Sequence, residues 1–215
     1  MRSIIICEGS TDFVLLQYFM RRAHQWEDYR KPDILNNNFK MIRELKRGTD
    51  SLLIGGAGGC SRIIPSADYV LERNTITALG EEFNNIIVIT DRDEISTEED
   101  FLNNFKEIID NRIIERSGEM VANQWIDVVQ KNGMGIDISV RILSLIIPFE
   151  TTGAMETFLL NAIAEEDEYD KNIIDVYFSI RTSAEQFNER QGILKNVAWE
   201  DYTRIQHDFG KLADL

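Results

Sequence analysis

The stretch SIIICEGSTD, residues 3–12, indicates the fold of this chain more directly than any other. A short β-branched run, typical of a buried strand, leads straight into Glu8, a glycine and a polar segment. Apolar side chains then recur at close to helical spacing as far as Arg22, with Ser10 or Thr11 available as the helix cap. The order predicts a strand, a tight turn and a helix.

A second apolar run has the same pattern of β-branched residues followed by carboxylates. Residues 86–90, IIVIT, end in the charged sequence Asp91-Arg92-Asp93-Glu94. Buried strands normally end in turn residues rather than in clustered like charges. The clustering therefore indicates that a positively charged group belongs beside these carboxylates.

The remaining chain continues the alternation of short apolar runs and helical patterns. Residues 51–54 form a strand candidate before the glycine-rich run 55–59, which we expect to bring backbone close to the acidic cluster. Further helices are expected over 61–71, from 96 to about 115 and over 153–164. A further strand is expected within 136–147. Residues 24–50 are expected to form an irregular connection with one short helix. Such units predict an α/β, Rossmann-like fold with a mainly parallel central sheet, helices on both faces and ligands at the carboxyl ends of the strands.

Domain organisation and composition narrow the class of protein. We expect one α/β domain over 1–165 and a helical C-terminal extension over 166–215, packed on the same domain. An apolar fraction of 43% is ordinary for a globular chain, and no run is long enough to cross a membrane, so a cytoplasmic protein with no membrane partner is expected. The formal charge of -14 opposes unspecific attraction to nucleic acid, so such a role needs metal ions, a local basic patch or a basic partner.

The carboxylates that follow the two runs are expected to meet. Side chains two apart on an extended segment point the same way, so Asp91 and Asp93 can present their carboxylates to one point. Glu8 ends a neighbouring strand, and Asp12 lies one turn into the following helix. Oxygen ligands of this kind suit Mg²⁺ or Mn²⁺. The alternative is that Asp91 and Asp93 form a solvated turn and Asp12 only caps its helix. Cys7 fits a small core residue.

Three motifs carry a resemblance to a known family. The sequence Glu8-Gly9 with Asp12, the pair Gly55-Gly56, and Asp91-Arg92-Asp93 follow three successive predicted strands. In order and spacing they resemble the TOPRIM domain of topoisomerases, primases and OLD-type nucleases, over about residues 1–165. The segment 147–156, which ends in Glu156, is similar to a late block of the small stand-alone TOPRIM proteins related to OLD nucleases.

The resemblance implies metal-dependent phosphoryl transfer on a nucleic-acid backbone. Asp91 and Asp93 would hold Mg²⁺ or Mn²⁺, Glu8 would be a ligand or general acid/base, and Asp12 a supporting ligand. Glu156 would assist a second ion, or is an ordinary acidic residue in the first turn of a helix. OLD-type sites also use a late lysine, for which Lys195 is the best match, the alternative being a solvated lysine. From its position after the glycine run, Arg62 is expected to contact a phosphate or to form a surface salt bridge.

The function that follows is an Mg²⁺-dependent endonuclease-like phosphodiesterase, acting on DNA in preference to RNA, alone or with an ATPase or other partner protein. Two other functions stay open. One is a regulatory or interaction protein that keeps the fold and performs no cleavage. The other is a receiver-like phosphotransfer domain, although that family has a lone aspartate where Asp91 and Asp93 form a pair.

Overall fold

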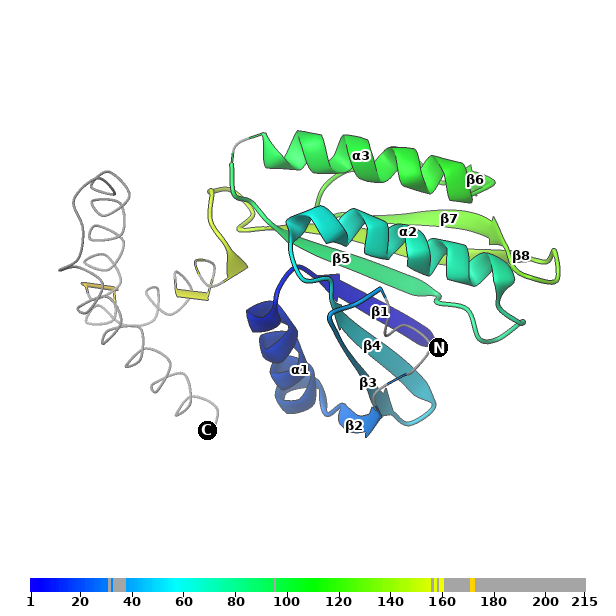
Figure 1. Ribbon diagram of the computed structural model, residues 1–215, viewed down its shortest axis with the longest axis horizontal. Coiled ribbons are helices and arrows are strands. Elements are labelled where there is room, and N and C mark those ends of the chain that lie inside the picture. Colours follow the sequence, from blue (N-terminus) through cyan, green and yellow to red (C-terminus); the bar gives the residue numbers. More distant parts are fainter. Residues whose placement is uncertain are drawn as a thin grey trace. The chain divides into compact units, whose positions relative to one another are not determined.

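A computed structural model describes residues 1–30, 32, 38–94, 96–155, 157, 159–160 and 171–172 (Figure 1). The chain divides into two compact units, Met1–Met155 and Glu156–Leu215. The fold described below is that of the first unit. The expected helical extension over 166–215 and most of the helix expected over 153–164 lie outside the described residues.

In the part of the chain that the structure describes, eight strands form one sheet in the order β2-β3-β4-β1-β5-β8-β7-β6. The elements in chain order are β1 (Arg2–Cys7), α1 (Ser10–His24), β2 (Glu27–Arg30), β3 (Met41–Arg47), β4 (Asp50–Gly56), α2 (Cys60–Ile76), β5 (Asn85–Asp91), α3 (Thr97–Arg112), β6 (Glu115–Arg116), β7 (Trp125–Lys131) and β8 (Asp137–Ile147).

The sheet is mixed, which corrects the expected fold class. β1 is parallel to β4 and to β5, and β5 is parallel to β8, whereas the other four neighbouring pairs are antiparallel. The prediction of a mainly parallel, Rossmann-like TOPRIM sheet is therefore wrong. The prediction failed at the two margins of the sheet. On one side, β2 and β3 occupy part of the expected irregular connection, and on the other side β6 and β7 extend the sheet. The parallel order is confined to the four central strands.

The helices cover both faces of these central strands, as predicted. A Cβ placed on Gly56 would lie 3.5 Å from the Cβ of Phe13 in α1, so Gly56 faces α1. Its neighbour Gly55 faces Phe39, which belongs to the same buried cluster as Ile63 and other residues of α2. Because successive strand residues point to opposite faces, α1 and α2 lie on opposite sides of the sheet. α3 contacts α2 and shares its side (Figure 1).

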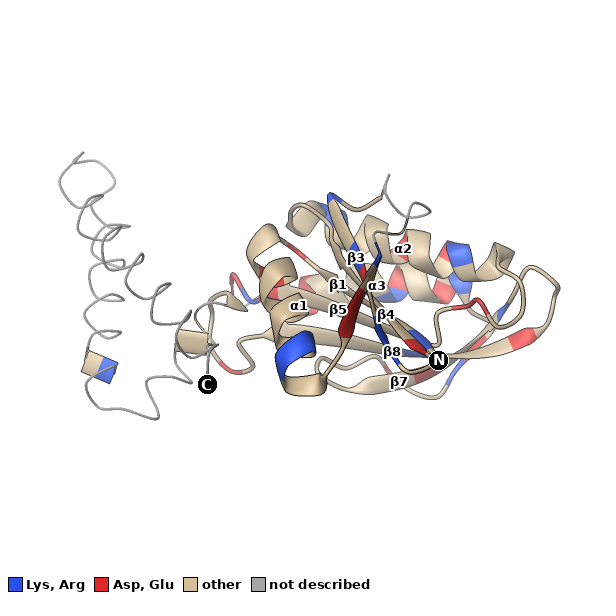
Figure 2. Cartoon of the chain, turned by 90° about the horizontal axis from the view of Figure 1, so that it is seen from below, with Lys and Arg blue, Asp and Glu red and all other residues tan. Residues whose placement is uncertain are grey.

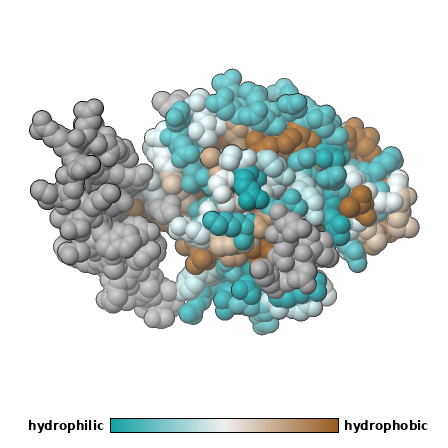
Figure 3. Space-filling view, viewed as in Figure 1, coloured by the Kyte–Doolittle hydropathy of each residue, from teal (hydrophilic) through white to brown (hydrophobic). Residues whose placement is uncertain are grey.

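The main core lies between the sheet and the pair α2 and α3. Its centre includes the fully buried Ile4, Ile6, Phe105 and Val140. On the face of the molecule seen in Figure 3, hydrophilic residues predominate and hydrophobic ones form separate patches. No helix among the described residues is both long enough and apolar enough to cross a membrane.

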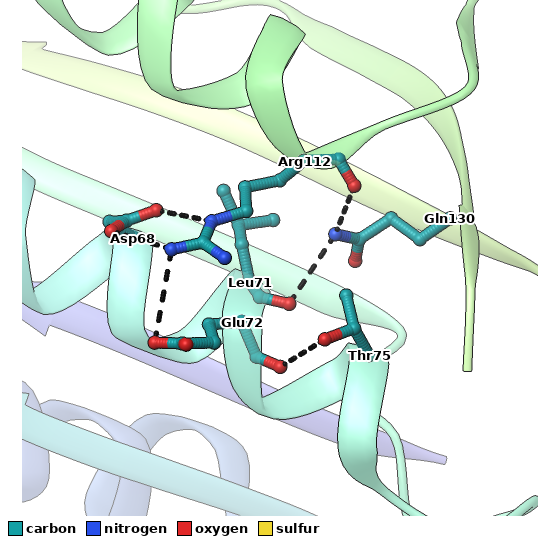
Figure 4. Close-up of polar contacts among 6 residues, drawn as sticks. All are labelled: Asp68, Leu71, Glu72, Thr75, Arg112 and Gln130. Carbon is teal, nitrogen blue, oxygen red and sulfur yellow. Dashed lines mark hydrogen bonds and ion pairs between the residues drawn. The ribbon is translucent and has the colours of Figure 1, made fainter. Parts of the chain in front are cut away.

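A polar cluster fixes the end of α3 against α2 and β7 (Figure 4). The guanidinium of Arg112 donates to both carboxylate oxygens of Asp68, at 2.7 and 3.1 Å, and lies 3.8 Å from Glu72. The fully buried amide of Gln130 donates to the carbonyl of Arg112 at 3.0 Å and to that of Leu71 at 3.4 Å. Hydrogen bonding to Asp68 raises the pKa of Arg112, so the guanidinium keeps its positive charge.

Candidate functional site

The arrangement of the helices defines one edge of the sheet as the place for a site. The chain leaves β1 through α1 on one face, and leaves β4 and β5 through α2 and α3 on the other. In open sheets, a crevice forms outside the carboxyl ends of strands whose connections diverge in this way. The corresponding place in this sheet is beyond the ends of β1 and its neighbours, where Glu8 follows β1 and Asp91 ends β5.

The glycine-rich run closes tightly around the end of β1. The backbone N–H groups of Gly58 and Gly59 donate to the carbonyl of Glu8 at 2.8 and 3.1 Å, and that of Ala57 donates to Cys7 at 2.9 Å. Gly58 has a φ of +93°, a conformation that side chains with a Cβ rarely adopt. The prediction that this run brings backbone close to the acidic cluster is confirmed.

Asp12 holds the turn between β1 and α1. Its Oδ2 atom accepts a hydrogen bond from the N–H of Gly9 at 2.9 Å, and its side chain is buried. A carboxylate in the first turn of a helix is also stabilised by the helix dipole. Gly9 is the N-cap of α1, so neither Ser10 nor Thr11 has the predicted capping role. Asp12 therefore positions the backbone that carries Glu8.

Cys7 is the buried last residue of β1. As predicted, it is fully buried, and its Sγ atom lies 3.6 Å from the carbonyl of Gly55. Burial raises the pKa of this thiol strongly, and the negative charges of Asp12, Asp91 and Glu8 raise it further. Because β1 and β5 are adjacent and parallel, Glu8, which follows β1, and Asp91, which ends β5, lie at the same edge of the sheet.

Asp91 is held by a segment that follows β8. Its Oδ1 atom accepts a hydrogen bond from the backbone N–H of Met155 at 3.0 Å. Asp91 pairs with Ile147 across the parallel strands β5 and β8, and the segment beyond Ile147 returns to form a bridge between Arg92 and Gly153. The start of the segment that contains Glu156 thus lies beside Asp91, although Glu156 itself is outside the described residues.

Arg92 is a positioning residue whose role the sequence did not reveal. Its Nε donates to the carbonyl of Pro148 at 2.8 Å, and one terminal nitrogen donates to the carbonyl of Phe149 at 2.9 Å. The same nitrogen forms an ion pair with Glu98 of α3 at 2.6 Å. Only 12% of the Arg92 side chain is exposed. Arg92 therefore ties the 148–153 segment to the end of β5 and to α3.

The other predicted site residues are placed differently. Asp93 is exposed two residues beyond β5, and Arg62 is exposed in the first turn of α2. Lys195 lies outside the described residues, as does Glu156. Within the described part of the chain, no group of three or more His, Cys, Asp or Glu side chains is close enough to hold one metal ion.

The comparisons with known proteins bear on the fold alone. No protein-family model matches the chain, and no curated protein matches it. The chain is similar to a hypothetical protein from Pyrococcus horikoshii at 16% sequence identity and a TM-score of 0.55, over 99% of this chain and 91% of that one.

Two further similarities are much weaker. A lactoylglutathione lyase from Agrobacterium tumefaciens matches at 12% identity over 66% of this chain and 91% of that one. The fosfomycin resistance protein FosX from Listeria monocytogenes, in complex with Mn(II) and sulfate, matches at 7% identity over 68% and 90%. Both have a TM-score of 0.20 and carry no inference for this chain. The TOPRIM resemblance remains a prediction from three motifs.

Proposed function

We propose that this chain is an Mg²⁺- or Mn²⁺-dependent phosphodiesterase acting on nucleic acid, alone or with a partner protein. The observation that carries the proposal is the place of two carboxylates on adjacent parallel strands: Glu8 directly follows β1 and Asp91 ends β5, while Asp12 holds the turn after Glu8. Carboxylates gathered at this edge of a sheet are unfavourable unless a cation compensates them. Their oxygen atoms are the ligands that Mg²⁺ and Mn²⁺ prefer.

The residues present fit a magnesium ion bound with its substrate. Mg²⁺ in phosphoryl-transfer sites is usually held by one or two protein carboxylates, with waters and substrate phosphates completing the shell. Glu8 and Asp91 would supply these carboxylates. A bound ion would activate water and stabilise charge on the phosphoryl oxygens.

The chain's own residues have separable tasks in this proposal. Asp12 holds the Gly9 turn, and Arg92 holds the segment that delivers the Met155 N–H to Asp91. Asp91 therefore keeps one oxygen in a hydrogen bond while its charge faces the neighbourhood of Glu8. The TOPRIM resemblance adds Asp93, Glu156 and Lys195 as further participants, with DNA as substrate and an ATPase as partner. These additions rest on the motifs.

Metal titration combined with two substrates tests the proposal. Mn²⁺ is titrated calorimetrically into metal-free wild type, Asp91→Asn and the control Asp137→Asn. Asp137 is exposed and pairs with Lys131 at the first residue of β8, whereas Asp91 aligns with Ile147 at the last residue of that strand. The same proteins are assayed for nicking of supercoiled plasmid and for hydrolysis of bis(4-nitrophenyl) phosphate.

Binding and hydrolysis that persist in Asp137→Asn and disappear in Asp91→Asn would support the proposal. Binding by wild type without hydrolysis of either substrate would instead support the non-catalytic alternative. If wild type binds no Mn²⁺ even with plasmid present, the proposed metal centre is wrong.

A further inference from the structure

The basic residues of this acidic chain are concentrated in one region. Residues 21–50 contain 8 of the 23 lysines and arginines and 5 of the 37 acidic residues, so their net charge is +3. The rest of the chain, with 15 basic and 32 acidic residues, has a net charge of -17. In the cartoon of Figure 2, blue marks basic residues in the last turn of α1 and on β3. A local attraction for anions is therefore built into a chain that otherwise repels them.

Aromatic rings are interleaved with these cations. The guanidinium of Arg47 lies 4.9 Å from the centre of the Trp26 ring, the ammonium of Lys46 lies 3.9 Å from that of Tyr29, and the guanidinium of Arg22 lies 5.5 Å from that of Tyr18. Arg47 and Lys46 are consecutive on β3, so Arg47 with Trp26 lies on one face of the sheet, and Lys46 with Tyr29 lies on the other. We call Tyr18, Arg22, Trp26 and Arg47 the basic-aromatic patch. Beside it, a hollow of about 400 Å³ is lined by Tyr18, Arg21, Arg22, Trp26, Glu27 and Asp28.

Two acidic side chains near the patch are paired with arginines. Asp28 pairs with Arg21 at 3.0 Å, and the buried carboxylate of Glu44 pairs with Arg30 at 2.7 Å. Within the patch, Tyr18 is 38% exposed. The patch therefore offers both cationic groups and aromatic surface to a ligand.

Basic residues continue from the patch along β3 toward the candidate site. β3 is antiparallel to β4, so Met41, at the start of β3, pairs with Gly56 at the carboxyl end of β4. Arg43 and Arg47 are four residues apart on this strand and share one face. Lys40, just before the strand, donates its N–H to Gly56 at 3.0 Å and packs against Gly58, whose own N–H binds Glu8. The distance along β3 is about 23 Å for seven residues.

We propose that the basic-aromatic patch binds one strand of nucleic acid, which Arg43 and Lys40 direct along β3 to the carboxylates. Proteins that bind single strands combine cations that follow the phosphates with aromatic rings on which bases stack. A duplex keeps its base faces covered, so the partly exposed ring of Tyr18 favours a single strand. The direction of the strand toward the carboxylates rests on the proposed function, whereas binding at the patch does not.

Fluorescence anisotropy with a labelled 20-nucleotide oligothymidine in EDTA tests the patch without any metal. The double variant Trp26→Ala/Arg47→Ala is compared with Trp125→Ala/Arg141→Ala. The control removes the same two residue types from a similar pair, in which Arg141 lies 4.6 Å from the Trp125 ring on β7 and β8. We expect the patch variant to bind at least about tenfold more weakly, because each stacked base contributes strongly, and the control to match wild type.

Substitutions that remove only a charge test the patch with less risk of misfolding. Arg22→Gln and Arg47→Gln remove only charge, and each is expected to reduce the salt dependence of binding by about one counterion. The matched control is Lys131→Gln, on an exposed lysine of β7. Absence of binding by wild type, equal loss in the patch and control variants, or equal competition by duplex DNA would overturn the inference.

The inference and the proposed function fail in different ways. Asp91→Asn should bind the oligonucleotide in EDTA as wild type does, and the patch variant should still hydrolyse bis(4-nitrophenyl) phosphate. A variant that loses plasmid nicking but still binds the oligonucleotide is affected in the carboxylate site and not in the patch. Loss of binding with retained hydrolysis of the small diester confirms the patch as the nucleic-acid contact.

Discussion

The backbone N–H of Met155 and the Oδ1 atom of Asp91 are 3.0 Å apart, although 64 residues separate them in sequence. This hydrogen bond joins the end of β5 to the segment that follows β8. Because it uses one oxygen of Asp91, it fixes the orientation of the carboxylate. Asp91 therefore has two tasks that substitutions can separate, one in holding the segment and one in carrying charge.

Asp91→Asn and Asp91→Ala should differ in stability and agree in metal binding. Asparagine retains an oxygen that accepts from Met155, whereas alanine leaves that N–H without its acceptor at a cost of about 1–2 kcal/mol in the free energy of unfolding. Both remove the negative charge, so both should lose Mn²⁺ binding. Chemical denaturation and calorimetry measure the two effects. Equal stability of the two variants would show that the hydrogen bond contributes nothing.

Arg92 should affect the site without touching a metal ion. Arg92→Lys keeps the charge, but a single ammonium cannot reproduce hydrogen bonds to Pro148 and Phe149 together with the ion pair to Glu98. We expect a loss of about 2–3 kcal/mol in stability and a tenfold or larger loss in Mn²⁺ affinity. Arg141→Lys, at a half-exposed arginine, is the matched control. Unchanged affinity in Arg92→Lys would mean that the 148–153 segment does not orient Asp91.

Core-facing elements could be predicted from the sequence, and the margins of the sheet could not. β1, β5 and α3 bury continuous or periodic apolar residues, which leave a clear pattern. All four residues of β2 are exposed, so this strand has no apolar face to detect. β7 does alternate, but one of its buried positions is the polar Gln130, whose amide binds carbonyls of α2 and α3.

The candidate site also has residues that the sequence predicted and residues that it did not. Glu8 and Asp91 were predicted to meet because each follows a strand pattern, and strand geometry alone brings their backbones together. The role of Arg92 depends on carbonyls 56 and 57 residues away, which no local pattern encodes. Lys40 belonged to a basic group in the sequence, and only the antiparallel pairing of β3 with β4 places it at the site edge.

Gly55 should tolerate no side chain while Phe39 remains. A Cβ at Gly55 would lie 2.5 Å from the Phe39 ring, so Gly55→Ala should cost about 1–3 kcal/mol through overpacking. In Gly55→Ala/Phe39→Leu, the smaller side chain should recover part of that cost. Gly118→Ala is the control, because its Cβ would have nothing within 4 Å. Additive effects of Gly55→Ala and Phe39→Leu in a double-mutant cycle would contradict this steric account.

Glu44 should contribute stability that is lost in acid. Burial alone would raise the pKa of this carboxyl, but hydrogen bonds from Ser51 and Arg30, at 2.6 and 2.7 Å, outweigh burial and lower it. The folded protein therefore binds this proton less readily than the unfolded chain, whose pKa is near the ordinary 4.5. The stabilisation is complete above that value and disappears as pH falls through the lower pKa of the folded state.

The variant Glu44→Gln tests this dependence because it has no charge to titrate. Denaturant unfolding of wild type and Glu44→Gln from pH 7 to pH 3 should show wild type more stable near neutrality, with the difference shrinking as the pH falls below about 4.5. Glu72→Gln, at a half-exposed glutamate 3.8 Å from Arg112, should show a smaller change. A difference between wild type and Glu44→Gln that stays constant over this range would mean that the paired carboxylate of Glu44 is not what responds to acid.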